Sequence, residues 1–152
     1  MTPGAISATV VADRVAWIRR MLAGIASLPL QSQEEFTARP STVAAAESYL
    51  RRALEALLDL GRHVLAKRFA QGVAEYKAIA TTLAEQGVLS ADDAALLVRL
   101  AGYRNRMVHF YHAVGDEELR LICRDNAVDI ENLLDALLTW LRTHADAMDH
   151  RI

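Results

Sequence analysis

The sequence predicts an all-α fold, an up-and-down bundle of four or five helices formed by a single domain over residues 1–152. Apolar residues make up 53% of the 152 positions, enough for a sizeable core, and many of them are alanine and leucine, which favour helix. Only three prolines and seven glycines interrupt the chain. No stretch alternates apolar and polar residues as a half-buried strand does.

The first helix is expected over about residues 6–28, because apolar residues recur there at three- and four-residue steps and form one stripe. Pro29 ends this helix. The polar stretch 31–39 follows, with room for a short extra turn, and Pro40 closes it.

Two helices are expected in the middle of the chain. The second helix begins after Ser41 or Thr42, either of which can cap it, and ends near Lys67. A loop over 68–75 separates it from a short third helix over 76–86.

Turn and cap residues frame the last two helices. Gly87 can take a positive φ and so ends the third helix, while Ser90 can cap the fourth. The fourth helix ends in the stretch RNRMVHFYH, residues 104–112. After a turn at 113–115, the fifth helix runs over 116–147 and begins with three acids, which suit the positive end of a helix dipole. The few residues after it are expected to fray.

The charge balance argues against a general nucleic-acid coat protein. A net charge of −2 provides no overall basic field for long DNA or RNA, although an RNA-cutting enzyme with a local basic cleft stays compatible. Fifteen of the 17 basic residues are arginine, which suits bidentate phosphate recognition, although codon bias is the simpler explanation.

Cysteine usage and hydropathy favour the cytoplasm. Cys123 is the only cysteine and is expected to pack in the core, so no intrachain disulfide can form. No positive charge precedes the first apolar stretch, so no secretory signal is expected. No window offers the roughly 20 uncharged apolar residues of a membrane span.

The stretch RNRMVHFYH gathers the most reactive side chains of the chain. Asn105 and His109 are four residues apart and share a helix face. Arg104 and His109 are five apart, which separates them by roughly 140° around a helix at about 100° per residue. To act together they need a kinked helix end or a second copy of the chain, which a symmetric dimer supplies.

These residue types can cleave RNA without a metal or cofactor. An arginine fork binds phosphate oxygens and stabilises their developing charge, and a histidine acts as general acid or base. An asparagine can orient both. A base removes the 2′-hydroxyl proton, the oxygen attacks the adjacent phosphate, and an acid protonates the leaving 5′-oxygen.

Two other interpretations of this stretch stay open. One is an arginine-rich helix end, favourable to the dipole, with His109 in a core contact. The other is a metal site formed by His109, His112, Asp116 and Glu117, although a zinc site needs three or four converging ligands and helix capping already explains the acids. No metal site is therefore predicted.

The remaining aromatic and histidine side chains have simpler explanations. Trp17 and Trp140 are expected to pack, with a dimer interface as the alternative. Tyr103 and Phe110 could stack on a base, although packing is commoner. Three further histidines carry no functional weight, the last two being expected in solvent: His63, His144 and His150.

The stretch RNRMVHFY resembles the Arg-Asn-x-x-x-His-x-Tyr signature of the HepT-like toxins, a branch of the HEPN superfamily. The match falls at Arg104, Asn105, His109 and Tyr111, and the resemblance extends over about residues 10–145. It implies a HEPN-like bundle that forms a homodimer, with the arginine and histidine lining a cleft at or near the dimer interface.

The resemblance also implies a function. Active HepT-like proteins are metal-independent ribonucleases, with tRNA a reported class of target, and act as toxins of type II toxin–antitoxin modules. Their antitoxin is an MNT-type minimal nucleotidyltransferase that adds AMP to the motif tyrosine, Tyr111 here, and silences the nuclease. By this resemblance Arg104, Asn105 and His109 are the catalytic residues.

Two matters stay open in the sequence. The family often has an acid or hydroxyl on the first helices of the cleft, and nothing selects among Glu47, Ser48 and Glu55. Some relatives bind nucleotide or substrate for a nucleotidyltransferase without cutting RNA, so a non-catalytic partner is the alternative function.

Overall fold

The computed structural model describes residues 4–109 and 114–150. Within these ranges the chain forms an all-α bundle, as predicted, with one two-stranded pairing at its end. The elements are β1 (Ile6–Ser7), α1 (Ala8–Ala26), α2 (Gln33–Thr37), α3 (Pro40–Phe69), α4 (Tyr76–Glu85), α5 (Ala91–Val108), α6 (Asp116–Thr143), a 3₁₀ turn (Ala145–Ala147) and β2 (Met148–Asp149).

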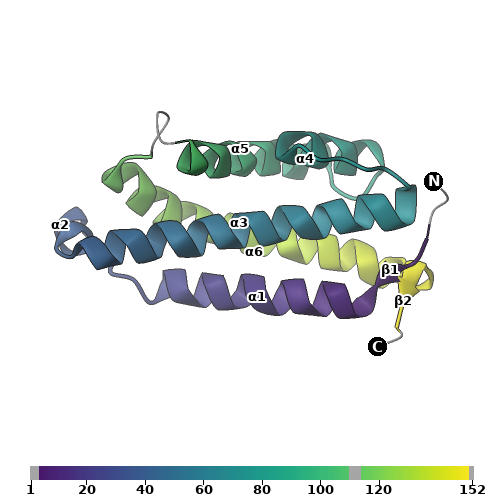
Figure 1. The fold of residues 1–152 in the computed structure, drawn as a ribbon, viewed down its shortest axis with the longest axis horizontal. Helices are drawn as coiled ribbons and strands as arrows, with labels where there is room; N and C mark the ends of the chain where they lie inside the picture. Colours follow the sequence, from purple (N-terminus) through teal and green to yellow (C-terminus); the bar gives the residue numbers. More distant parts are fainter. Residues whose placement is uncertain (1–3, 110–113, 151–152) are drawn as a thin grey trace.

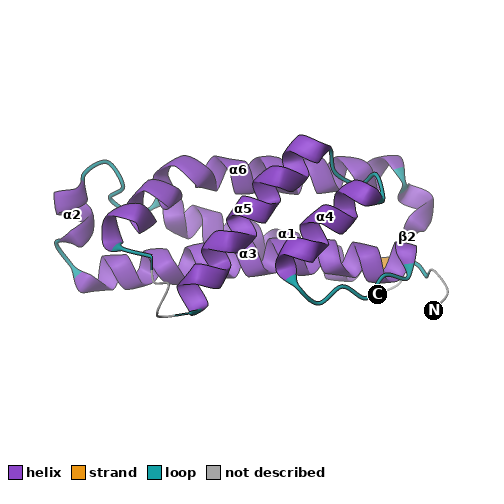
Figure 2. Ribbon diagram, turned by 90° about the horizontal axis from the view of Figure 1, so that it is seen from above, coloured by secondary structure: helices purple, strands orange, loops and turns teal. Residues whose placement is uncertain are grey.

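The three long helices α1, α3 and α6 lie side by side, and α4 and α5 pack along one side of them (Figure 1). Seen from above, α4 and α5 cross the long helices at an angle (Figure 2). Helix α3 is central, because it packs on all five other helices. Its apolar stripe is fully buried, with Leu50, Leu54, Leu57 and Leu65 at 0% exposure. No described helix is long and apolar enough to cross a membrane.

Proline and serine positions explain where the helices differ from expectation. Pro40 does not close the polar stretch but is the first residue of α3. Proline is tolerated there because an N–H at the first position of a helix would have no partner within the helix. The extra turn within that stretch is the separate helix α2, capped by Ser32, whose hydroxyl accepts from the Glu35 N–H at 3.0 Å. Helix α1 begins at Ala8 rather than residue 6, because Ser7 caps it.

The two chain ends pair, so the predicted fraying after the last helix is wrong for Met148 and Asp149. Ile6 pairs with Met148 and Ser7 with Asp149 in a parallel register. Ile6 is fully buried, which anchors the pairing to the core. A pairing of two residues per strand is too short to show alternation in a sequence.

Several side chains outside the motif pack as expected and one does not. Cys123 is buried, and burial raises the pKa of its thiol to about 12, so it is a packed residue rather than a nucleophile. Trp140 contacts the ring of Phe69 with centroids 5.9 Å apart. The expectation that His144 is solvated is wrong, because its ring stacks on Trp140 at 4.1 Å.

His63 joins the N-terminal segment to α3. Its Nε2 accepts a hydrogen bond from the Ser7 N–H at 3.1 Å, which requires that nitrogen to be unprotonated. Partial burial lowers the pKa of His63, and the charges of Lys67 and Arg14 lower it further.

We expect the free energy of unfolding to fall as pH drops from about 7 to about 5, because the unfolded histidine titrates near 6.5 and takes up a proton that folded His63 resists. The protection factor of the Ser7 amide against hydrogen exchange should fall over the same range. In His63→Gln this part of the pH dependence should vanish, and an unchanged pH profile in that variant would show that His63 is not its source.

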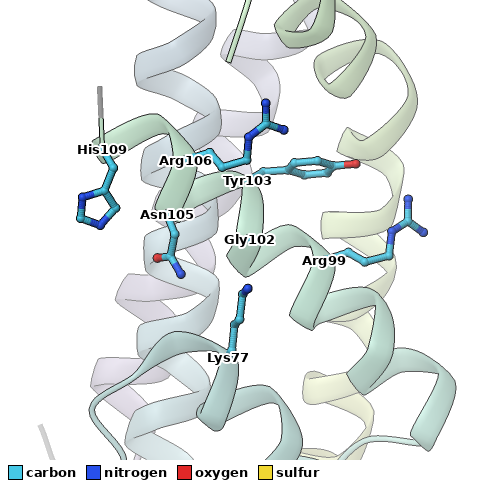
Figure 3. A pocket seen from close by; sticks show the side chains of 7 residues that line it. All are labelled: Lys77, Arg99, Gly102, Tyr103, Asn105, Arg106 and His109. Carbon is cyan, nitrogen blue, oxygen red and sulfur yellow. The ribbon is translucent and has the colours of Figure 1, made fainter. Parts of the chain in front are cut away.

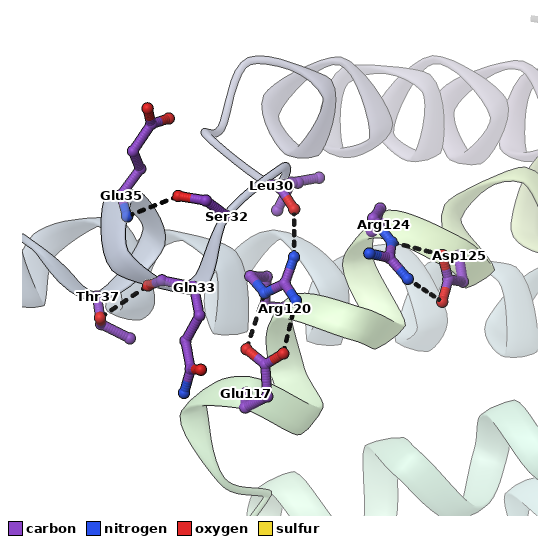
Figure 4. A network of polar contacts seen from close by, with 9 residues as sticks. All are labelled: Leu30, Ser32, Gln33, Glu35, Thr37, Glu117, Arg120, Arg124 and Asp125. Carbon is purple, nitrogen blue, oxygen red and sulfur yellow. Dashed lines mark hydrogen bonds and ion pairs between the residues drawn. The ribbon is translucent and has the colours of Figure 1, made fainter.

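Arg120 ties the loop before α2 to α6 (Figure 4). It is the one buried charged residue among those described, at 7% exposure. Its Nη1 donates to the Leu30 carbonyl at 2.8 Å, and its Nε donates to Glu117 at 2.8 Å. The hydrogen bond from Arg120 lowers the pKa of the Glu117 carboxyl.

Arg120→Ala should lower the thermal midpoint by several degrees, because the Leu30 carbonyl loses its donor inside the protein. Arg124→Ala is the matched control, since Arg124 is exposed and its described ion pair is with its neighbour Asp125 at 2.8 Å. Thermal unfolding followed by circular dichroism measures both. Equal midpoints for the two variants would contradict this role of Arg120.

Candidate functional site

The motif lies in the last turn of α5. Ser90 caps the start of this helix, its hydroxyl accepting from the Asp93 N–H at 3.1 Å. The helix ends at Val108, and His109 takes an extended backbone while its N–H still bonds the Asn105 carbonyl at 3.2 Å. The sequence predicts a helix that continues through residue 112, whereas within the described residues α5 ends at Val108. Phe110, Tyr111 and His112 lie outside the described residues.

Asn105 and His109 line the same pocket, of about 420 Å³, between α4 and α5 (Figure 3). Their four-residue spacing places them on one face, as predicted, and His109 is exposed at its rim. The other lining residues are Lys77, Arg99, Gly102, Tyr103 and Arg106. No carboxylate is among the described lining residues, so the pocket favours an anion.

Gly102 leaves room for the Lys77 side chain to reach this pocket. Lys77 extends from α4 toward the bare surface of Gly102 on α5 (Figure 3), and a Cβ there would lie 3.7 Å from the Lys77 Cε. The lysine stem therefore packs on the glycine while its ammonium reaches the pocket. Arg106 also lines the pocket, but its guanidinium is engaged by Glu118 through two hydrogen bonds of 2.8 and 2.7 Å.

Arg104 points to the opposite flank of α5. Its Nη2 lies 3.5 Å from a carboxylate oxygen of Glu55 on α3, and its guanidinium stacks over the Tyr76 ring at 4.7 Å. Its Nη1 donates to the Asn105 side chain at 3.5 Å. Arg104 does not line the pocket that holds His109. The two residues therefore diverge around the helix, as their five-residue spacing predicts.

Among the candidates Glu47, Ser48 and Glu55, Glu55 makes a described contact with the motif. It accepts from Arg51 at 2.8 Å and from Arg104 at 3.5 Å, so it links α3 to the motif. Glu47 instead lines a small separate pocket beside Asp116. Burial raises the pKa of Tyr76, and Asp59 raises it further while Arg104 opposes the shift, so the phenol under Arg104 stays protonated and neutral.

The alternative metal site receives no support from the described side chains. Glu117 already accepts the Arg120 guanidinium, and His112 falls outside the described residues. No group of three or more histidine, cysteine or carboxylate side chains is placed to hold a metal in the described ranges.

A protein-family model for ribonuclease HepT-like proteins matches residues 18–137, which include the motif from Arg104 to His109. The chain belongs to the ribonuclease HepT-like family. The resemblance inferred from the motif is thereby confirmed, and the family supports ribonuclease activity at the family level. No protein in a search of curated sequences matches this HepT-like chain.

Solved structures share the HepT-like fold at low sequence identity. The tri-AMPylated HEPN toxin of Shewanella oneidensis, in complex with MNT antitoxin, aligns with a TM-score of 0.77 and 18% identity over 86% of this chain and 97% of that one. YutE, a cytosolic protein of unknown function from Bacillus subtilis, aligns with a TM-score of 0.74 and 18% identity over 91% and 93%. At such identity these likenesses show the fold alone.

Proposed function

We propose that this HepT-like protein is the ribonuclease toxin of a type II toxin–antitoxin module, and that it cleaves RNA without a metal ion or cofactor. Transfer RNA is the first substrate class to test. The proposal treats residues 1–152 as one functional domain and places it in the cytoplasm, where its RNA substrate lies.

The observation that carries the proposal is the pocket at the end of α5. It places an imidazole and an amide, those of His109 and Asn105, beside the cations of Lys77 and Arg99. An RNA phosphate would be held there by positive charge within reach of a general acid or base. Arg104 supplies a further cation from the other flank of α5, where Glu55 contacts its guanidinium.

Cleavage follows from these groups. One His109 imidazole removes the 2′-hydroxyl proton, and the oxygen attacks the adjacent phosphorus to form a cyclic phosphate. Arg104 stabilises the charge that builds on the phosphoryl oxygens. The leaving 5′-oxygen takes a proton from solvent water, so each centre uses a single His109.

A homodimer is part of the proposal because one chain does not bring the groups together. Arg104 contacts α3 and Tyr76, whereas His109 lines the α4–α5 pocket. Two-fold symmetry can place Arg104 of one protomer opposite His109 of the other. Each composite centre would then draw on both chains.

Regulation would act on Tyr111, two residues after His109. We propose that an MNT-type nucleotidyltransferase antitoxin adds AMP to this hydroxyl. The added phosphate and nucleoside would exclude RNA by charge and volume. The likeness to an AMPylated HEPN toxin bound to an MNT antitoxin supports this choice of partner.

The test is RNA cleavage by the purified chain in EDTA, prepared with and without a co-expressed MNT-type nucleotidyltransferase, alongside its intact mass. We expect cleavage by the unmodified chain, and loss of cleavage when AMP-sized mass appears on Tyr111. An unmodified dimer that binds but cuts no RNA would instead favour the non-catalytic partner.

A further inference from the structure

A second basic surface lies between α1 and α3, which run side by side (Figure 1). It holds two hollows of about 300 and about 430 Å³ that share Arg14 and Trp17. The first is lined by Arg14, Trp17, Arg51, Arg52, Glu55 and Asp59. The second is lined by Arg14, Trp17 and Arg20 together with Asp13 and Ala16. Both are the size of a small ligand site.

Two of the three acids that line this surface are already paired with arginines. Glu55 is paired with Arg51 and Arg104, and Asp59 is paired with Arg62 at 3.1 Å. No carboxylate among the described residues makes an ion pair with Arg14, Arg20 or Arg52, and all three are exposed. Asp13 is the one acid of the two hollows for which no ion pair is described, and it stands against three arginines that no described carboxylate pairs. Guanidinium forks in such excess suit phosphate oxygens.

Trp17 provides an aromatic platform within this surface. It is partly buried against the core and contributes to both hollows. The Arg20 guanidinium lies 5.6 Å from its ring centroid. A partly exposed indole flanked by guanidinium groups is the combination that stacks unpaired bases and binds their phosphates.

The surface is continuous with the motif through Glu55. This carboxylate lines the first hollow and also contacts Arg104, so the hollow lies next to the Arg104 guanidinium. A strand of RNA held at Arg104 can therefore continue across α3 toward α1.

We infer that the α1–α3 surface is a nucleotide subsite for single-stranded RNA, in which Trp17 stacks a base near the cleaved phosphate and Arg14 and Arg52 bind the flanking phosphates. The inference rests on the proposed ribonuclease function and adds to it the substrate class, an unpaired strand. It also extends the enzyme's contact with RNA beyond the motif.

Fluorescence of Trp17 tests the stacking. The test protein is the full chain with His109→Ala, to stop turnover, and Trp140→Phe, to leave Trp17 as the only tryptophan. Titration with a short single-stranded RNA oligonucleotide should quench its emission. The matched protein with Trp17→Phe and Trp140 retained should show no quenching, because Trp140 packs on Phe69 and His144 away from this surface.

Affinity tests the same contacts independently. Trp17→Ala should weaken binding of the oligonucleotide roughly tenfold. Arg52→Ala should reduce the slope of log K against log salt by about 0.7, the value for one phosphate contact on a single strand. Arg142→Ala, at an exposed arginine of α6, removes the same charge elsewhere and should change neither.

The outcomes separate this inference from the proposed function. Unchanged emission and unchanged affinity in Trp17→Ala, with the native chain still cutting RNA, would overturn the subsite and leave the ribonuclease. Trp17-dependent binding by a native chain that cuts nothing would uphold the subsite alone. If Trp17→Ala or Arg52→Ala instead changes the oligomeric state by light scattering, this surface is an interface between copies and the inference is wrong.

Discussion

His109→Ala should abolish growth arrest and lower RNA cleavage by about 10²–10⁴-fold, the usual contribution of a general acid or base. The fold and the proposed dimer should persist, because His109 is an exposed residue at the end of α5 and the core residues of that helix lie in its earlier turns. Thermal unfolding and light scattering on the same sample check both.

His150→Ala is the matched control for this prediction. It makes the same chemical change at an exposed histidine beyond α6, where His150 borders an apolar hollow with Leu138 and Met148. It should keep full cleavage. A folded His109→Ala dimer that still cuts RNA at the native rate would remove His109 from the mechanism.

Arg104→Ala should lower the cleavage rate at saturating RNA by about 10²–10³-fold, since one donor to a developing oxyanion contributes that much. Arg104→Lys should recover little, because an ammonium keeps the charge but not the fork that spans two oxygens. Glu55 stays paired with Arg51 in both variants, so the fold should be preserved.

Glu55→Gln separates positioning from catalysis. The neutral amide can still accept from Arg104 but no longer holds it by charge, so the rate should fall less than in Arg104→Ala. Kinetics over a range of RNA concentrations distinguish a lower kcat from a higher KM. A Glu55→Gln variant as slow as Arg104→Ala would assign Glu55 a direct part in the chemistry.

Local signals in the sequence predicted most of the fold. Apolar stripes located the long helices, and Ser90 marked the start of α5 because serine caps through its own hydroxyl. Pro40 begins α3 rather than ending the polar stretch before it, since a proline can either end one segment or begin the next helix. The pairing of Ile6 with Met148 joins opposite ends of the chain and has no local signal.

The sequence predicted the motif residues of the candidate site but not the residues that other helices contribute to it. The spacing of Arg104, Asn105 and His109 predicted that Asn105 and His109 share a helix face and that Arg104 diverges from His109, and the pocket beside that face appears only in the structure. Lys77 and Glu55 come from other helices, and their approach to α5 depends on how α3 and α4 pack. The role of Gly102, which has no side chain, becomes clear only when the structure shows Lys77 packed against it.

Mixing two inactive variants tests the central claim most directly. Arg104→Ala and His109→Ala subunits, each inactive alone, are unfolded, combined in equal amounts and refolded together, and RNA cleavage is then measured in EDTA. If each centre takes Arg104 from one chain and His109 from the other, half the dimers are mixed and each has one intact centre. About a quarter of the native activity should return. No recovery, in a mixture shown by mass to contain mixed dimers while refolded native protein cuts RNA, would contradict the composite site.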